Sequence, residues 1–266
     1  MNPVILPAIH GWLWVLRGFR LFRPYAALWL LLLFFYLTLI ALVSVVPVVG
    51  PLLTLCVVPG VSAGWMVACR ASQERLPPTL KHIFEPFQVN RQAQFRLGLG
   101  YMAGFMTALL LSALFDGGLF LRVWLFGYGG DSKQAGTLYP GILGFTLLLT
   151  PVLLGFWFAP ALVHWRGMAP GKAVFFSFFA GLRNWRALLV YVLGWMFFLF
   201  GGILVLATIF AVLLPADMRS LTIASFVIVP YYFAVLGALF CSFYAGYCAI
   251  FPEAPPADEP LSAPAA

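Results

Sequence analysis

Long stretches without charge constrain the fold of this 266-residue chain more than any other feature of its sequence. A lipid environment requires every backbone polar group to be satisfied internally, and a helix of about 20 apolar residues spans a bilayer. Five stretches contain no Asp, Glu, Lys, Arg or His: 24–69, 97–115, 134–163, 187–216 and 220–252. The first is long enough for two crossings and each of the others for one. The sequence therefore predicts an all-α integral membrane protein with six transmembrane helices.

The six predicted helices pair into three hairpins. A Pro-Val-Val-Gly-Pro turn at 47–51 divides the first charge-free stretch into two crossings. Only 9% of the residues are charged, against about 25% in a soluble domain, which excludes a soluble fold. The helices are expected near residues 25–46, 52–70, 96–115, 141–164, 187–213 and 221–250.

The distribution of basic residues predicts the orientation. Twelve of the 15 Lys and Arg residues fall on the side that holds both termini. The other side holds Arg122, Lys133 and Arg219. Because basic residues collect on the cytoplasmic side of membrane proteins, we expect both termini to be cytoplasmic. The net charge of +7 is explained by this topology, so we expect no nucleic-acid partner.

A basic amphipathic helix is predicted before each hairpin. The clearest covers 170–187, where the apolar residues recur at spacings of three and four. That apolar face consists of Phe175, Phe178, Phe179, Leu182 and Trp185. The segment is too short and too charged to cross a bilayer and leads directly into an uncharged run, as in helices that lie in the membrane interface.

The same pattern suggests a threefold internal repeat. Pro7, Pro78 and Pro170 each lie 13 residues before an arginine, and each unit is followed by two predicted spans. The repeat units are about 7–70, 78–165 and 170–250, within a single transmembrane domain, 1–251. Three unrelated juxtamembrane helices remain the alternative. The acidic, Pro-rich tail 252–266 cannot build a core and is expected to be disordered.

The sequence offers few groups for catalysis. No nucleotide-binding, metalloprotease or nucleophile-elbow motif occurs, and the three histidines share no ligand spacing, so we expect no enzyme activity, no cofactor and no metal. Asp116, before a Gly-Gly pair, is the carboxylate closest to the membrane interior. It opens an outer connection, 116–140, which is either an interfacial connector or a lid or docking loop.

Helix breakers indicate where a cavity could form. Pro59, Pro151 and Pro230 each lie in the second helix of a predicted hairpin. A proline kinks a helix, and a kink opens space at mid-membrane, with Asp116 as the nearest acid. Kinks also occur in solidly packed bundles, because neighbouring helices satisfy the freed backbone groups.

Two functional hypotheses follow. In the first, the protein is a non-enzymatic accessory or scaffold subunit that associates with lipids, with another membrane protein or with a second copy of itself. Its contacts with anionic headgroups would come from Arg20, Arg23, Arg183, Arg186 and Trp185. In the second, it is a transporter or flippase for an apolar or amphipathic small molecule, which requires the cavity beside the prolines.

Several strings resemble a family of uncharacterised bacterial multipass inner-membrane proteins. They are residues 62–71, Asp116-Gly-Gly118, residues 158–162 and residues 175–186. The likeness runs from about residue 12 to 251, and Arg183-Asn-Trp-Arg186 is its most specific part. The organisation is also distantly similar to membrane domains fused to some glycerophosphodiesterases, but this chain has no room for their catalytic domain. The resemblance implies the fold and an inner-membrane location, and it implies no activity.

Overall fold

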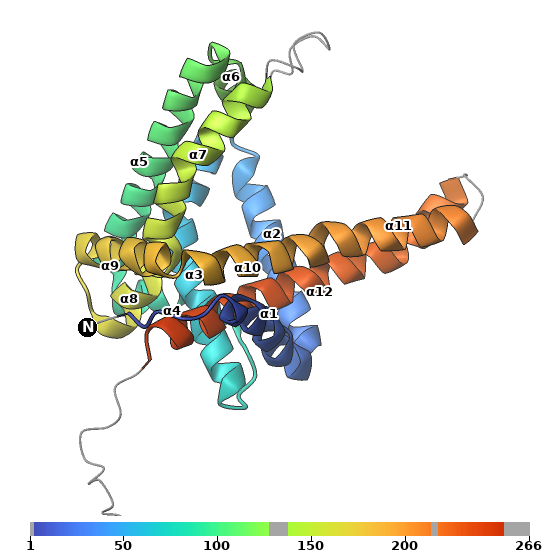
Figure 1. Cartoon of the computed structure of the whole chain (residues 1–266), viewed down its shortest axis with the longest axis horizontal. Helices are drawn as coiled ribbons and strands as arrows, with labels where there is room; N and C mark the ends of the chain where they lie inside the picture. The colour runs from blue at the N-terminus through green and yellow to red at the C-terminus, as the bar shows by residue number, and fades with distance from the viewer. Residues whose placement is uncertain (1–2, 128–137, 214–217, 253–266) are drawn as a thin grey trace, which may run out of the picture.

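The computed structural model describes residues 3–127, 138–213 and 218–252, and every regular element in these ranges is a helix (Figure 1). The helices are α1 (Ile9–Phe22), α2 (Ala26–Ser44), α3 (Val49–Gln73), α4 (Leu80–Val89), α5 (Arg91–Asp116), α6 (Leu119–Phe126), α7 (Leu138–Trp157), α8 (Ala159–Arg166), α9 (Pro170–Arg183), α10 (Trp185–Met196), α11 (Gly202–Leu213) and α12 (Met218–Ile250).

Six segments among the described residues are long and apolar enough to cross a membrane, which confirms the predicted all-α multipass fold. They are Ile9–Ser44, Val49–Gln73, Arg91–Asp116, Leu138–Arg166, Trp185–Leu213 and Thr222–Ile250. The first includes α1, because a short 3-10 turn, Arg23–Tyr25, carries α1 directly into α2. Three hairpins result: α2 with α3, α5 with α7, and α10–α11 with α12.

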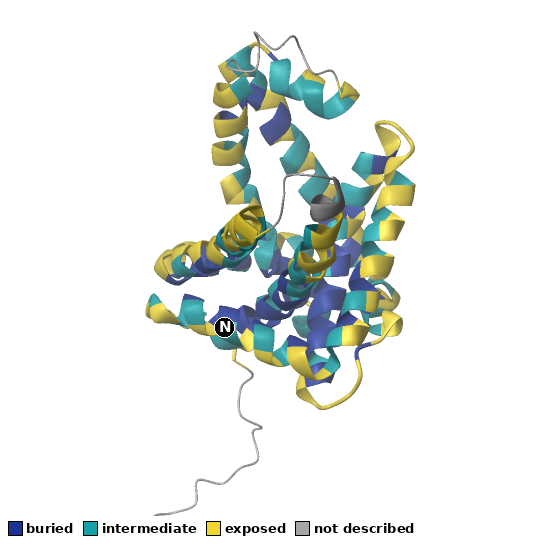
Figure 2. Cartoon of the chain, turned by 90° about the vertical axis from the view of Figure 1, so that its right-hand side faces the viewer, coloured by how far each residue is buried: buried dark blue, intermediate teal, exposed yellow. Residues whose placement is uncertain are grey.

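The hairpins diverge from a common base. The third hairpin points away from the first two, and buried residues concentrate where the three meet (Figures 1 and 2). The outer parts expose apolar side chains, and α11 has no buried residue at all. Only the base of the bundle is therefore a conventional core, and the hairpin arms present apolar surface to the surrounding lipid.

Each of the short helices α1, α4 and α9 packs on one of the hairpins. Helix α4 packs on α3, α9 packs on α7, and α1 packs on α10 and α12. The first helix of the chain thus completes the last hairpin. The threefold repeat itself stays a prediction.

Glycines allow the closest of these approaches. A Cβ on Gly18 of α1 would lie 2.5 Å from the carbonyl oxygen of Ala238 in α12, and one on Gly64 of α3 would lie 2.1 Å from the carbonyl oxygen of Ile83 in α4. The backbones of the paired helices are therefore in direct contact, which only glycine permits. Large side chains then fill the space around the contacts, and Trp14, Trp29, Trp65 and Phe158 are fully buried.

The fourth expected helix, 141–164, is broken in the structure. Helix α7 ends at Trp157 and α8 begins at Ala159, because Pro160 lacks an N–H and cannot continue the helix. Ser177 of α9 repairs the break: its hydroxyl accepts a hydrogen bond from the Phe158 N–H (3.0 Å) and donates one to the Leu154 carbonyl (2.8 Å). The expected helix 187–213 likewise contains a π-helical turn, Phe197–Gly201.

The outer connection is partly helical. Helix α6 occupies its first part, whereas residues 128–137 lie outside the described residues, as does the predicted tail from residue 253. Gly117 and Gly118 adopt left-handed backbone conformations, with φ of 67° and 87°, and so turn the chain between α5 and α6. The carboxylate of Asp116 accepts hydrogen bonds from the N–H groups of Gly118 (2.9 Å) and Phe120 (2.7 Å).

Candidate functional site

A chamber of ≈ 330 Å³ lies where the three hairpins meet. Its wall is almost entirely apolar and draws on every hairpin: Tyr36, Val58, Pro59, Ser62, Met66, Tyr101, Leu153, Phe156, Trp157, Phe240 and Phe243. Tyr36 and Tyr101 each follow the start of their helix, α2 or α5, by ten residues. At 1.5 Å per residue this is about 15 Å, half the thickness of a bilayer core. The chamber therefore lies inside the membrane-capable spans of all three hairpins.

A second apolar cavity adjoins the chamber. It has a volume of ≈ 280 Å³ and lies between α2 and α3, and it shares Tyr36 and Val58 with the chamber. Its other lining residues run toward the outer turn of the first hairpin: Leu39, Ile40, Val43, Leu53, Thr54 and Val57. The two cavities are thus neighbours that meet at Tyr36 and Val58, and both offer a hydrocarbon chain few polar groups.

The structure separates the four residues that were expected beside a cavity. Pro59 is buried and lies in the chamber wall, where the Ser62 hydroxyl donates to its carbonyl (2.7 Å). Pro151 and Pro230 are exposed and do not belong to the chamber lining. Asp116 instead caps the start of α6, as a carboxylate at a helix end does.

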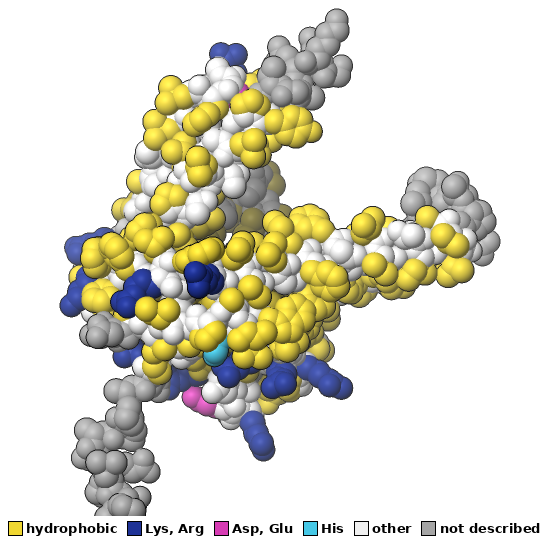
Figure 3. Space-filling model, viewed as in Figure 1, with side chains coloured by type: hydrophobic (Ala, Val, Ile, Leu, Met, Phe, Trp, Pro, Cys, Tyr) yellow, Lys and Arg dark blue, Asp and Glu magenta, His cyan; other side chains and the backbone are white. Residues whose placement is uncertain are grey.

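Basic side chains gather on the base of the bundle, where the spans begin and end (Figure 3). We call this end the basic face; the expected lipid- or partner-binding residues Arg20, Arg23, Arg183, Arg186 and Trp185 are all exposed there. The Arg186 guanidinium lies 5.4 Å from the centre of the Trp185 ring. The four arginines do not form one cluster, because α1 begins beside Ala187 and ends beside Gly237, which separates the two pairs by about 20 Å.

Asn184 has a role that the sequence did not reveal. Its side chain is buried between α9 and α10, where Oδ1 accepts from the Leu6 N–H (2.9 Å) and Nδ2 donates to the carbonyls of Val4 (3.0 Å) and Ala180 (3.0 Å). The Val4 N–H in turn donates to the carbonyl of Ile250 at the end of α12 (3.0 Å). The N-terminal segment thereby ties α9 and α10 to α12.

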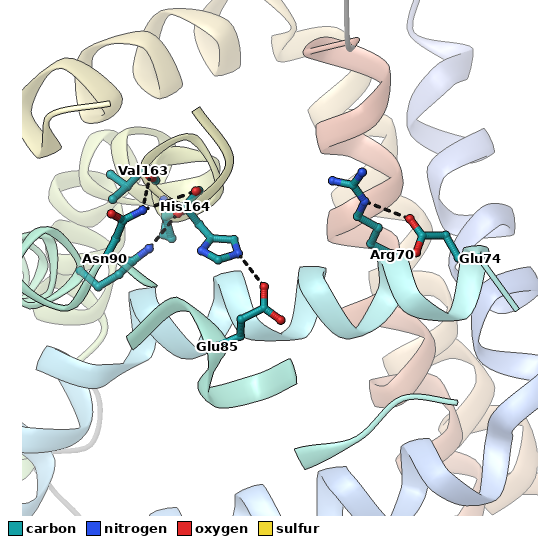
Figure 4. Close-up of polar contacts among 8 residues, drawn as sticks. Arg70, Glu74, Glu85, Asn90, Val163 and His164 are labelled. Carbon is teal, nitrogen blue, oxygen red and sulfur yellow. Dashed lines mark hydrogen bonds and ion pairs between the residues drawn. The ribbon is translucent and has the colours of Figure 1, made fainter. Parts of the chain in front are cut away.

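Polar groups also join α4 and α5 to α8 (Figure 4). Asn90 Nδ2 donates to the Val163 carbonyl (3.2 Å), and Gln94 Nε2 donates to the Pro160 carbonyl (3.1 Å). Glu85 Oε1 lies 3.3 Å from His164 Nε2. The side chains of Asn90 and Gln94 thus hold α8 through its backbone carbonyls. Among the residues that the structure describes, no group of three His, Cys, Asp or Glu is arranged to hold a metal ion.

The basic face also contains a polar pocket, which the sequence analysis missed. Its volume is ≈ 350 Å³, and α3, α8 and α12 contribute to it. Its lining residues are Arg70, Gln73, Glu74, Trp165, Tyr244, Tyr247, Cys248, Phe251 and Pro252. These residues stand at the ends of three helices that are far apart in sequence, so only the helix packing could bring them together.

A comparison with known proteins identifies the protein family of the chain. It is 34% identical over 260 residues to a probable inner membrane protein of Burkholderia thailandensis, and the match covers 94% of each chain. No protein-family model matches the chain. No solved structure matches it either. The near-complete coverage, together with six membrane-capable helices, shows that the chain belongs to the same family of bacterial inner membrane proteins.

Proposed function

We propose that this protein is a non-enzymatic lipid-handling protein of the inner membrane, which holds the apolar chain of a membrane-dissolved molecule between its three hairpins. The observation that carries the proposal is the chamber, which lies inside the membrane-capable spans and is lined by all three hairpins. Apolar cavities do not retain water, and lipid chains are the apolar molecules that a bilayer supplies in excess.

In this proposal the apolar chain of the bound molecule enters the chamber from the side of the bundle, between α2 and α3. The cavity between α2 and α3 adjoins the chamber at Tyr36 and Val58, so a chain can extend from the outer part of the first hairpin to the centre of the bundle. Both termini face the cytoplasm, and the basic face contacts the anionic headgroups of that leaflet. Movement of the bound molecule between leaflets would make the protein a flippase.

Filling the chamber tests this function. Ser62→Phe adds an aromatic ring to the chamber wall. If this ring displaces two methylene groups of the bound lipid chain, the binding free energy of the lipid weakens by about 1.6 kcal/mol. Bound lipid should therefore fall roughly tenfold. The measurement is mass spectrometry of lipids retained by the purified protein in detergent-free lipid discs, on the wild type and the variant.

Ser225→Phe is the matched control. Ser225 hydrogen bonds to a carbonyl three residues earlier, as Ser62 does, but it is exposed on α12. It should retain the wild-type amount of lipid. Equal lipid retention by a folded Ser62→Phe protein and the wild type would contradict the proposal.

An accessory or scaffold role is the second candidate, and a separate observation favours it. Helix α9 and the start of α10 expose Phe175, Phe179, Leu182 and Trp185 beside the basic residues Arg183 and Arg186. A large apolar patch rimmed by charge marks a surface that meets another protein or the membrane interface.

Removing the charge from this surface tests the second candidate. Each basic residue near an anionic membrane contributes about 1 kcal/mol, so Arg183→Ala with Arg186→Ala should weaken association with anionic lipid roughly 30-fold at low salt. Arg183→Lys with Arg186→Lys should retain most of the association with anionic lipid. Arg122→Ala, at the opposite end of the spans, should leave this association unchanged. Unchanged retention of both anionic lipid and co-purified protein would exclude the role.

A further inference from the structure

Two phenol hydroxyls belong to the otherwise apolar wall of the chamber. Tyr36 comes from α2 and Tyr101 from α5, so they stand on different hairpins. Their phenol groups are close enough to interact electrostatically. A third hydroxyl of the wall, that of Ser62, already donates to the Pro59 carbonyl (2.7 Å). The two tyrosines are therefore the hydroxyl donors that the chamber offers to a ligand.

Neither of these phenol hydroxyls has a hydrogen-bond partner among the residues that the structure describes. Other tyrosines of the membrane-capable spans do have partners: the hydroxyl of Tyr191 bonds to that of Ser242 (2.6 Å), and the hydroxyl of Tyr231 donates to the Phe198 carbonyl (2.6 Å). A phenol removed from water usually finds a partner, and lipid chains offer none. Two unused donors in one chamber therefore indicate a ligand with acceptor oxygen atoms.

Flat rings make up most of the chamber wall. Six of its eleven lining residues are aromatic. The ring of Phe156 lies 5.3 Å from that of Tyr101, and the ring of Phe240 lies 6.1 Å from that of Tyr36, between centroids. Aromatic rings pack against one another stacked or edge-on, so a flat conjugated ring fits among them. None of the described lining residues is charged, which favours a neutral ligand.

We propose that the chamber binds an isoprenoid quinone, whose ring carbonyls accept hydrogen bonds from Tyr36 and Tyr101. This inference rests on the proposed function, because it names the membrane-dissolved molecule that the chamber holds. A quinone is neutral, its ring is flat, and its two carbonyls lie on opposite edges of the ring, so donors from two hairpins can bind it together. Its isoprenoid tail would pass Val58 into the apolar cavity of ≈ 280 Å³ between α2 and α3.

Glycerolipids also carry carbonyl acceptors, in their ester groups. These groups lie beside the headgroups at the membrane surface, whereas the chamber lies inside the membrane-capable spans. The ester carbonyls also belong to no flat ring that would match the aromatic wall. The observations therefore favour the quinone, and diacylglycerol, a neutral glycerolipid, serves as the competing probe.

Removing the two hydroxyls tests the inference. The wild-type protein, in lipid discs loaded with a decyl-substituted benzoquinone, should enrich the quinone over discs without protein, as measured by mass spectrometry. Tyr36→Phe and Tyr101→Phe each remove one hydrogen bond, so each should lower the enrichment about fivefold and the double variant about 30-fold. Tyr139→Phe is the matched control and should retain the wild-type amount, because Tyr139 is exposed on α7 and does not line the chamber.

The outcomes distinguish this inference from the proposed function. Ser62→Phe should lower the retention of quinone and of other lipid alike, whereas Tyr36→Phe and Tyr101→Phe should lower that of the quinone alone. A wild-type protein that retains phospholipid but does not enrich the quinone would overturn the inference and leave the proposed function standing. Enrichment of diacylglycerol instead, or quinone enrichment that is unchanged in the double variant, would overturn it as well. Retention of no apolar molecule would overturn both.

Discussion

Replacing Gly11 by alanine is expected to destabilise the folded protein strongly, although alanine is the better helix former. Gly11 is in the first turn of α1, where that helix meets α10. A Cβ at this position would lie 2.0 Å from the carbonyl oxygen of Ala187 and 2.7 Å from the backbone nitrogen of Tyr191. Both obstacles are backbone atoms, so no side chain can move aside and α1 must shift away from α10.

The expected loss is at least about 1–3 kcal/mol, the usual cost of overpacking a core. Gly171→Ala is the matched control: Gly171 is in the first turn of α9, and nothing lies within 4 Å of its Cβ position. That change should be neutral or stabilise by roughly 0.5–1 kcal/mol. Thermal unfolding in lipid discs measures both. If α1 were a free interfacial helix, both alanines would stabilise the protein, and such a result would contradict the structure.

The spans could be predicted from the sequence, because the cost of burying charge in lipid acts on each segment by itself. The charge-free stretches and the turn near Val48 are sufficient to locate the hairpins. The break at Pro160 was harder to predict. A proline weakens a helix, but whether the helix continues depends on a distant partner, here the Ser177 hydroxyl.

The candidate sites were predictable only in part, because they depend on which helices lie next to one another in the fold. Proline marks a kink but not the neighbour that the kink faces, so Pro59 lies in the chamber wall whereas Pro151 is exposed. Exposure of the arginines follows from amphipathic periodicity, which is local. The pocket of Arg70 and Glu74 needs α8 and α12 beside α3, and no spacing within one helix reveals that arrangement.

Asn184 is the clearest case of a residue whose importance depends on long-range packing. It is 1% exposed and makes three hydrogen bonds, two of them to the N-terminal segment at Val4 and Leu6. Since Val4 also bonds to Ile250, the segment closes the base of the bundle between α10 and α12. The neighbouring Arg183 and Arg186 are exposed, so this asparagine has a structural role and the arginines are free for surface contacts.

Asn184→Ala should therefore lower the free energy of unfolding by about 2–4 kcal/mol, because three hydrogen bonds are lost at roughly 1 kcal/mol each and a small cavity remains. Arg183→Ala, one residue away and exposed, should change it by less than about 0.5 kcal/mol. Hydrogen exchange at the Val4 and Leu6 amides should accelerate in the asparagine variant and not in the arginine variant. Deleting residues 1–6 should cost less in the Asn184→Ala background than in the wild type, since both changes remove the bonds of Asn184 to Val4 and Leu6 and only the Val4–Ile250 bond is then left to lose. Full additivity, or unchanged exchange at Leu6, would show that the segment is held by other contacts.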